Sequence, residues 1–496
     1  MRTKKMMKKE SNTKSYRNPL KGWFFFRSCG LLVLFCLALS FRLSAQDVTL
    51  KINLRGVYES KITLMPLTGA NAMKSLAEGS GIKNNETATI VVPKDKLPGE
   101  FVLRFDYKEK ESSTPYPAEK RIVISDQNLE LRVNPLYSGN TDSTYFQKGE
   151  KENALFARFS RENSKQREKV ALLQGFLMNY DDTQSKFYQQ GIEEFESRRN
   201  KYNQWLKEQV VQNKALFVSH TFQFQHVPQL AFKGTEAERL QSMIGHYFDD
   251  MDFIDTLMIR TTNLPDWMNG YVNIYGSMST TEQLRDSLFI LAGKRAIEKA
   301  KTGHPKVYGW MVDYFYKGYE SFAMQKGTEM LRQYIDDPNC LTSKRQEILK
   351  RFEGMQKMKK GSAAPSFNAE MIDGMKLLFD GVLKQKKYEL VVFYESDCSH
   401  CKDLLKELSQ WYSVPENKVW FDVITVALDD NRKTWEGNYQ KNKFEWHDVW
   451  ATGGVNSQAA TDYYILSTPV IYIIDKEMKV AAMPQTMKEI ETFLNN

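Results

Sequence analysis

The sequence predicts a multidomain chain with an N-terminal β-sandwich, a central all-α region and a C-terminal α/β domain. Three patterns indicate this order. Apolar residues alternate with polar ones between positions 47 and 134, and helical spacing dominates positions 142–360. Near position 390 an apolar run leads into a turn with two cysteines and then into an amphipathic helix. At 496 residues the chain is long enough for two to four domains.

Residues 1–45 have the pattern of a secretory signal peptide. A basic segment ends at Arg27, an eleven-residue apolar run covers positions 31–41, and positions 43–45 supply a small-residue cleavage site before Gln46. The apolar run is shorter than the roughly 20 residues that a membrane-spanning helix requires. We therefore expect export to the periplasm with cleavage before Gln46. An uncleaved membrane anchor is the alternative.

The basic charge of the chain is concentrated in this leader. Positions 1–45 hold ten Lys or Arg and one Glu, a net charge of +9, whereas the whole chain carries +8. The rest of the chain therefore has a formal net charge of −1. Without a basic surplus, the sequence indicates no nucleic-acid or anionic-membrane partner. No later stretch is long and apolar enough for a stable membrane span after signal cleavage.

The predicted β-sandwich covers residues 46–138. Strict alternation of apolar and polar residues marks its clearest strands, at positions 48–54, 101–105 and 129–133, and polar or Gly/Pro turns separate them from shorter runs. Half-buried antiparallel strands have this period of two. No cluster of ligand-type residues occurs there, so we interpret the charged faces as solvated surface.

The predicted helical domain covers residues 142–360, with eight to ten helices in an irregular bundle. Aromatic residues crowd the segment 308–319. Core packing explains them, and an exposed peptide-binding groove is the alternative. A basic linker with small residues and proline, Lys357–Pro365, leads out of this domain.

One acidic group in the helical domain has the residue types of a metal site. Its members are His246, Asp249, Asp250, Asp252 and Asp255. His246 and Asp250 are one helical turn apart, but no independent convergent ligand accompanies them. The pattern favours a helix end with N-capping aspartates around Asp252.

The C-terminal domain, residues 363–496, is organised around the segment Tyr388–Lys402. An apolar, β-rich run ends at Tyr394, and leucines and aromatic residues at helical spacing follow Cys401. Cys398 therefore lies at a helix N-terminus, where unpaired N–H groups and the helix dipole favour a thiolate. Cys401 is one turn further along, within reach of a disulfide with Cys398.

Two other interpretations of this cysteine pair compete with a redox role: half of a zinc site, and a static disulfide. Four-coordinate zinc needs a second pair of ligands, and the chain has no second Cys-x-x-Cys. Tight Cys-x-x-Cys loops tend to form exchangeable disulfides, which favours redox chemistry. The other cysteine beyond the leader, Cys340, lies in an acidic turn-like loop, and we interpret it as a free structural thiol.

A second motif, Ser467–Asp475, has Thr468-Pro469 at the head of a β-run, which is unusual because proline cannot donate to a sheet ladder. Together with the cysteine turn, it resembles the thioredoxin fold, and specifically the TlpA/ResA-like thiol-disulfide oxidoreductases of the bacterial cell envelope. The resemblance covers about residues 363–496. It implies that Pro469 is cis and packs beside the cysteines, and that Thr468 offers its backbone to the substrate as an added strand.

Three positions depart from that family. Val392 stands where thioredoxins carry a buried Asp, Leu404 stands where the envelope reductases often carry a Glu, and Tyr394–Asp397 replaces the usual aromatic-X-X-Trp lead-in. The proton acceptor for Cys401 is therefore not where the family has it. Glu395 is a candidate, and a solvated loop charge is the alternative interpretation of that residue.

The resemblance and the motifs together predict an exported thiol–disulfide oxidoreductase, most simply a reductase. Cys398 is expected to attack, Cys401 to resolve the mixed disulfide, and His400 to tune the acidity of Cys398. The residues expected to shape the substrate groove are Thr468, Pro469 and Tyr394.

This chemistry needs no metal and no organic cofactor. Its partners are protein dithiol or disulfide substrates and an envelope protein that donates electrons. Two other functions stay open at this point. One is a disulfide oxidase or isomerase, and the other is a client-binding folding factor in which the redox pair is ancillary.

Overall fold

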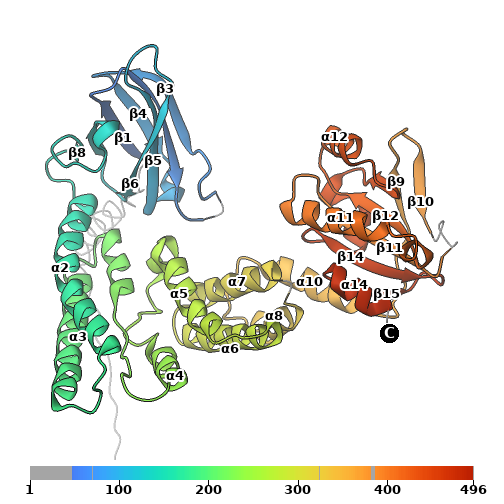
Figure 1. The fold of residues 1–496 in the computed structure, drawn as a ribbon. Helices are drawn as coiled ribbons and strands as arrows, with labels where there is room; N and C mark the ends of the chain where they lie inside the picture. Colours follow the sequence, from blue (N-terminus) through green and yellow to red (C-terminus); the bar gives the residue numbers. More distant parts are fainter. Residues whose placement is uncertain (1–46, 70, 323, 381–385, 495–496) are drawn as a thin grey trace, which may run out of the picture. The chain divides into compact units, whose positions relative to one another are not determined.

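The computed structural model describes residues 47–69, 71–322, 324–380 and 386–494, in two units (Figure 1). The first unit holds Lys74–Glu150 and the chain up to Pro66, and the second holds Leu67–Met73 and the chain from Lys151. The predicted signal peptide, residues 1–45, lies outside the described residues. No described helix has the length and apolar character needed to span a membrane.

The first unit consists of two four-stranded β-sheets. One has the order β4-β1-β7-β8, from Thr87–Val92, Val48–Leu54, Leu129–Val133 and Tyr145–Phe146. The other has the order β3-β2-β5-β6, from Ala77–Lys83, Glu59–Pro66, Gly99–Lys108 and Tyr116–Ile124. One apolar cluster draws side chains from both sheets, as in a sandwich.

Alternation accounts for the strands that the sequence predicted. In β1, for example, Val48, Leu50, Ile52 and Leu54 are buried and the residues between them are more exposed. Two details differ from the prediction. β1 pairs with β7 in parallel, and the two-residue strand β8 extends the sheet beyond the predicted boundary at residue 138. β8 is too short for an alternating pattern to reveal it.

The helical part of the second unit has nine α-helices among its described residues, within the predicted range of eight to ten. Their bounds are α2 Glu152–Asn179, α3 Lys186–Gln212, α4 Glu236–His246, α5 Asn263–Ser277, α6 Glu282–Lys301, α7 Pro305–Ser321, α8 Gln325–Met330, α9 Arg332–Ile335 and α10 Arg345–Lys357. Two 3₁₀ helices, η3 (Phe217–Gln225) and η4 (Thr256–Arg260), interrupt the series.

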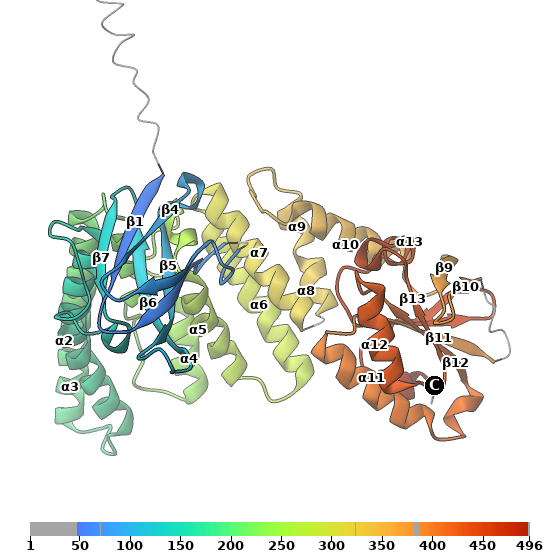
Figure 2. The ribbon, with the colours of Figure 1, turned by 90° about the horizontal axis from the view of Figure 1, so that it is seen from above.

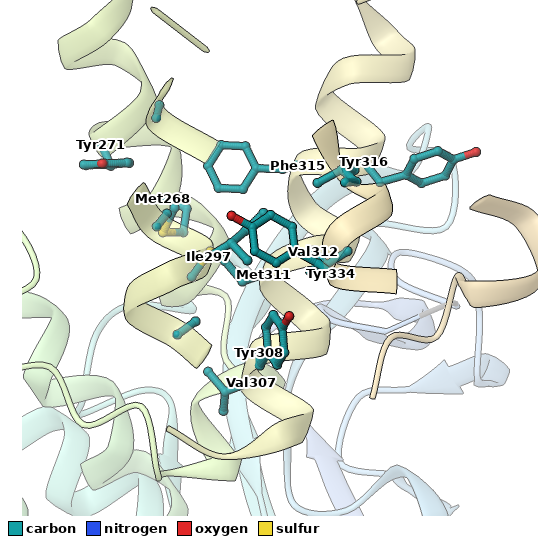
Figure 3. Close-up of a cluster of buried hydrophobic side chains, with 14 of the residues drawn as sticks. Met268, Tyr271, Ile297, Val307, Tyr308, Met311, Val312, Phe315, Tyr316 and Tyr334 are labelled. Carbon is teal, nitrogen blue, oxygen red and sulfur yellow. The ribbon is translucent and has the colours of Figure 1, made fainter. Parts of the chain in front are cut away.

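The aromatic segment of α7 forms the centre of the helical core (Figure 3). Tyr308, Tyr316 and Tyr319 are each at most 2% exposed, and Met311 is fully buried against them. Buried rings stabilise a core by removing large apolar surface from water. Four of the six aromatic residues of this segment are buried, and Trp310 and Tyr314 are half-buried against the same core. Core packing therefore accounts for the segment, and the buried rings do not support an exposed peptide-binding groove along it.

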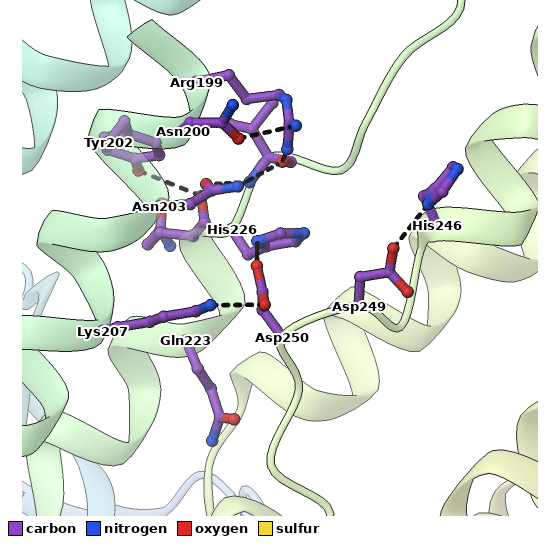
Figure 4. Close-up of polar contacts among 12 residues, drawn as sticks. Arg199, Asn200, Tyr202, Asn203, Lys207, Gln223, His226, His246, Asp249 and Asp250 are labelled. Carbon is purple, nitrogen blue, oxygen red and sulfur yellow. Dashed lines mark hydrogen bonds and ion pairs between the residues drawn. The ribbon is translucent and has the colours of Figure 1, made fainter. Parts of the chain in front are cut away.

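The acidic group around His246 divides into separate ion pairs (Figure 4). His246 contacts Asp249 at 2.7 Å, and Lys207 contacts Asp250 at 2.6 Å. Asp255 instead pairs with His220 and caps η4. These side chains do not converge on one point, and no group of three metal-ligating side chains occurs within the described part of the chain.

The C-terminal part is a seven-stranded sheet with helices on both faces (Figure 2). The strand order is β10-β9-β13-β12-β11-β14-β15, from Lys376–Phe379, Phe367–Glu370, His447–Trp450, Phe421–Ala427, Tyr388–Tyr394, Val470–Asp475 and Val480–Ala482. The helices are α11 Ser399–Tyr412, α12 Arg432–Asn442, α13 Gln458–Asp462 and α14 Met487–Leu494.

Burial on both faces explains why the sequence of the inner strand β11 is a continuous apolar run. Leu390 and Val392 point into a cluster with residues of α11, α12 and α14, whereas Val391 and Phe393 point into a second cluster with residues of α13. β11 pairs in parallel with β12 and antiparallel with β14. A strand covered on both faces has no polar alternation, since every side chain is buried.

Candidate functional site

Cys398 is the N-cap residue of α11. β11 ends at Tyr394, a short turn follows, and α11 begins at Ser399. The Cys398 Sγ accepts a hydrogen bond from the backbone N–H of Cys401 at 3.2 Å. The sulfur therefore lies at the positive end of the helix, in contact with one of the N–H groups that has no partner inside the helix.

The two thiols differ in their access to solvent. Cys398 is half-buried, whereas Cys401 is fully buried, and both are free thiols in this structure. Burial, followed by the hydrogen bond with Cys398, raises the pKa of Cys401 to about 12. Only Cys398 is thus placed to meet an incoming disulfide, and Cys401 lies behind it in the apolar cluster under α11.

Thr468 and Pro469 lie beside Cys398, although they follow it by seventy residues. The Thr468–Pro469 peptide bond is cis, and the Cys398 thiol donates to the Thr468 carbonyl oxygen at 3.7 Å. The contact arises because β14, which begins at Val470, is the antiparallel neighbour of β11. The two sequence motifs therefore meet at one end of two adjacent strands.

Two carboxylates hold the loop between β11 and α11. Glu395 Oε2 accepts from the Thr468 hydroxyl at 3.0 Å. Asp429 accepts from the backbone N–H of Ser396 at 3.0 Å and from its hydroxyl at 2.7 Å. Burial raises the pKa of Asp429 above its usual value, although the Ser396 hydrogen bonds oppose the rise. The sequence patterns assign no role to Asp429, which they mark as a carboxylate directly after a strand.

His400 and Tyr394 occupy very different environments. His400 is exposed on the first turn of α11. Tyr394 is 0% exposed, and its hydroxyl donates to the Asp448 carboxylate at 2.9 Å. Tyr394 therefore presents no exposed surface, although it is among the residues that line a cavity together with Glu395 and Lys402, and its part in a substrate groove stays a prediction. The alternation of β11 turns Tyr394 to the same face as Val392, under the helices.

Asp448 is a buried carboxylate that the sequence did not reveal. Its side chain accepts hydrogen bonds from Tyr394, Thr425 and Trp435. Burial nevertheless dominates and raises its pKa to about 6. In the sheet register, Asp448 of β13 lies opposite Thr425 of β12, and Thr425 lies opposite Val392 of β11. The Asp448 carboxylate is thus two strands away from Val392.

Asp448 is expected to make stability depend on pH. The pKa of Asp448 is about 6 in the folded protein and about 3.9 in the unfolded chain. The contribution of this side chain to the free energy of unfolding is therefore fully present below about pH 4 and is lost as the pH rises through 6. The loss is on the order of 2–3 kcal/mol in the free energy of unfolding. Asp448→Asn should remove this loss, and urea unfolding at pH 4.5 and 7.5 measures it. A stability difference between variant and wild type that is the same at both pH values would contradict the assignment.

Comparison with known proteins identifies the fold of this region. Residues 385–480 match the profile of a family described as thioredoxin-like. The search of curated proteins found no match.

Several solved structures are similar to the chain. A thiol-disulfide oxidoreductase from Bacteroides fragilis is 26% identical over 27% of this chain and 98% of its own, with a TM-score of 0.24. The thioredoxin domain of a thiol-disulfide oxidoreductase from Bacteroides vulgatus is 23% identical over 28% of this chain and 96% of its own, with a TM-score of 0.25. A thioredoxin-like protein from Bacteroides caccae is 18% identical over 54% of this chain and 96% of its own, with a TM-score of 0.35. The family match shows that the C-terminal part of this chain contains a thioredoxin-like domain.

Proposed function

We propose that this protein is an exported thiol–disulfide oxidoreductase of the TlpA/ResA-like kind that acts on proteins of the cell envelope through Cys398 and Cys401. The observation that carries the proposal is the asymmetry of the two thiols. Cys398 caps α11 and is accessible, while Cys401 is buried one turn behind it. Thr468 and Pro469 flank the accessible sulfur and offer a backbone edge to a substrate.

The reaction has two exchanges. The Cys398 thiolate attacks one sulfur of a substrate disulfide, so that the substrate S–S bond breaks and a mixed disulfide forms. The released substrate thiolate takes a proton from solvent. Cys401 then attacks the Cys398 sulfur, which forms the Cys398–Cys401 disulfide and releases the second substrate thiol. The substrate gains two electrons, the cysteine pair loses two, and an envelope donor must return them.

In the proposed function the Cys398–Cys401 pair reduces substrate disulfides and does not form them. His400, which is exposed on the first turn of α11, is the side chain that the proposal assigns to tuning Cys398. Each substrate reduction leaves the Cys398–Cys401 pair oxidised, so an envelope donor must return two electrons before the next cycle. Thiol trapping of the protein in its native envelope is expected to find Cys398 and Cys401 predominantly reduced. A pair found almost wholly oxidised would replace the reductase assignment with an oxidase or isomerase.

Trapping of substrates tests the function itself. In a Cys401→Ala variant the mixed disulfide cannot be resolved, so envelope proteins should remain attached to Cys398 and be released by reductant. The matched control is the double variant Cys398→Ser/Cys401→Ala, which keeps every other surface of the protein. Equal recovery of partners with both variants would show that capture does not depend on thiol exchange and would refute the proposal.

A further inference from the structure

The turn that carries Cys398 borders a cavity that the two exchange steps do not use. The cavity has a volume of about 220 Å³, and Glu395 and Ser396 of the turn form part of its lining. Side chains of α11, such as Leu405, and of α12, such as Asn438, complete the lining. Sites for drug-sized molecules usually measure roughly 300–1,000 Å³. This smaller cavity therefore suits one or two side chains of a bound protein.

Two lysines of the lining follow Cys398 along α11. The backbone N–H of Lys402 donates to the carbonyl oxygen of Cys398 at 3.1 Å, which places Lys402 one helical turn beyond the accessible thiol. Lys406 follows Lys402 by four residues and also lines the cavity. Residues four apart are neighbours on the surface of a helix, so Cys398, Lys402 and Lys406 form a row along one side of α11.

The charges of this lining are unbalanced. Lys402 and Lys406 are exposed, and neither forms an ion pair with another described residue. Among the described lining residues the one carboxylate is Glu395, whose Oε2 accepts from the Thr468 hydroxyl at 3.0 Å. Asp448 is 4% exposed and does not belong to the lining. The cavity thus presents two unpaired cations against one carboxylate, next to the thiol that meets the substrate.

We propose that this cavity binds an acidic segment of the substrate protein, whose carboxylates face Lys402 and Lys406 while the substrate cysteine reacts with Cys398. This inference rests on the proposed function and adds a class of substrate to it. A helix rises about 1.5 Å per residue, and an extended chain about 3.3 Å. The positions four and eight residues beyond Cys398 therefore correspond to acidic residues about two and four positions from the substrate cysteine.

The two lysines act on the formation of the mixed disulfide, which is the first exchange. Complementary charges speed the encounter of two proteins and set their orientation more than they increase the final affinity. Salt weakens such an attraction between exposed charges, because it shortens the distance over which they interact. A preference for acidic substrates should therefore appear in the rate constant of the first exchange and should decrease at high ionic strength.

Peptides with one cysteine, blocked as a mixed disulfide with thionitrobenzoate, isolate the first exchange. The Cys398 thiolate attacks the peptide sulfur, the bond to thionitrobenzoate breaks, and the coloured thionitrobenzoate thiolate leaves. One peptide has glutamates at the second and fourth positions before its cysteine, another has them after it, and a third has glutamine at all four positions. Stopped-flow absorbance gives the second-order rate constant of each peptide with the full chain from Gln46 onward, at low and at high salt.

At low salt, at least one glutamate peptide is expected to react with the wild-type protein about 3- to 10-fold faster than the glutamine peptide. Lys402→Gln/Lys406→Gln should remove this difference, and Lys402→Glu/Lys406→Glu should make the glutamine peptide the faster one. The readout is the ratio of rate constants between peptides. A change in the acidity of Cys398 alters all three rate constants alike, so it leaves this ratio unchanged.

The matched control is Lys433→Gln/Lys488→Gln. Both lysines are exposed in the same domain, on α12 and α14, and neither lines the cavity. This variant makes the same change in net charge as Lys402→Gln/Lys406→Gln, and it should keep the preference for the glutamate peptide.

Equal rate constants for the three peptides in the wild-type protein would overturn the proposal. A preference that persists in Lys402→Gln/Lys406→Gln would also overturn it, as would a preference lost equally in the control, because net charge would then be its cause. Release of thionitrobenzoate at the same rate by the wild-type and Cys398→Ser proteins, with every peptide, would instead refute the proposed function. The failure of the acidic-substrate proposal is therefore distinguishable from the failure of the proposed function.

Discussion

Cys398→Ser is expected to abolish disulfide reduction in the full chain, with the rate of a model protein disulfide such as that of insulin falling to the uncatalysed level. The reason is positional. Cys398 is the accessible thiol, its sulfur accepts the N–H of Cys401, and no other described cysteine is exposed. Cys340 cannot substitute, because burial raises its pKa to about 11.

Cys401→Ser is expected to give a different defect. Attack by Cys398 continues, but the mixed disulfide accumulates because the resolving thiol is gone. Non-reducing electrophoresis after acid quenching separates the two outcomes, since Cys401→Ser gives an adduct and Cys398→Ser gives none. If the adduct forms instead through Cys401 in the Cys398→Ser protein, the roles of the two cysteines are reversed.

Gly309→Ala is expected to destabilise the helical part by about 3 kcal/mol or more. Gly309 lies in α7, where a Cβ would stand 2.2 Å from the backbone carbonyl of Leu341 and 2.5 Å from the Thr342 backbone nitrogen. The clashing atoms of Leu341 and Thr342 belong to the backbone and cannot rotate away as a side chain would. The next residue is also fixed, because the backbone N–H of Ser343 donates to the carboxylate of Asp313 in α7 at 3.0 Å. Denaturant unfolding followed by circular dichroism measures the effect.

Gly318→Ala is the matched control in the same helix. A Cβ at Gly318 has no atom within 4 Å, so alanine meets open space. Alanine also loses less conformational freedom than glycine when a helix forms. Gly318→Ala is therefore expected to raise the free energy of unfolding by roughly 0.5–1 kcal/mol. Equal changes in the free energy of unfolding for Gly309→Ala and Gly318→Ala would show that helix propensity, and not the contact with Leu341, determines the effect.

Much of the fold was predictable because its signals are local. The alternation of Val48 to Leu54 requires only that one face of a strand be buried, and the apolar run before Tyr394 requires that both be buried. The place of Cys398 at a helix start also follows from the residues around it, since an apolar strand and an amphipathic helix leave only a short turn between them.

The contacts of the candidate site were decided by the tertiary structure. The sequence alone determined the three kinds of structure, the cysteine pair and the motif at Pro469. It did not determine that Thr468 binds Glu395, or that Tyr394 turns inward to Asp448, because those contacts join segments more than fifty residues apart. The order of strands in the sheet creates such contacts, and no local periodicity encodes which strand ends become neighbours.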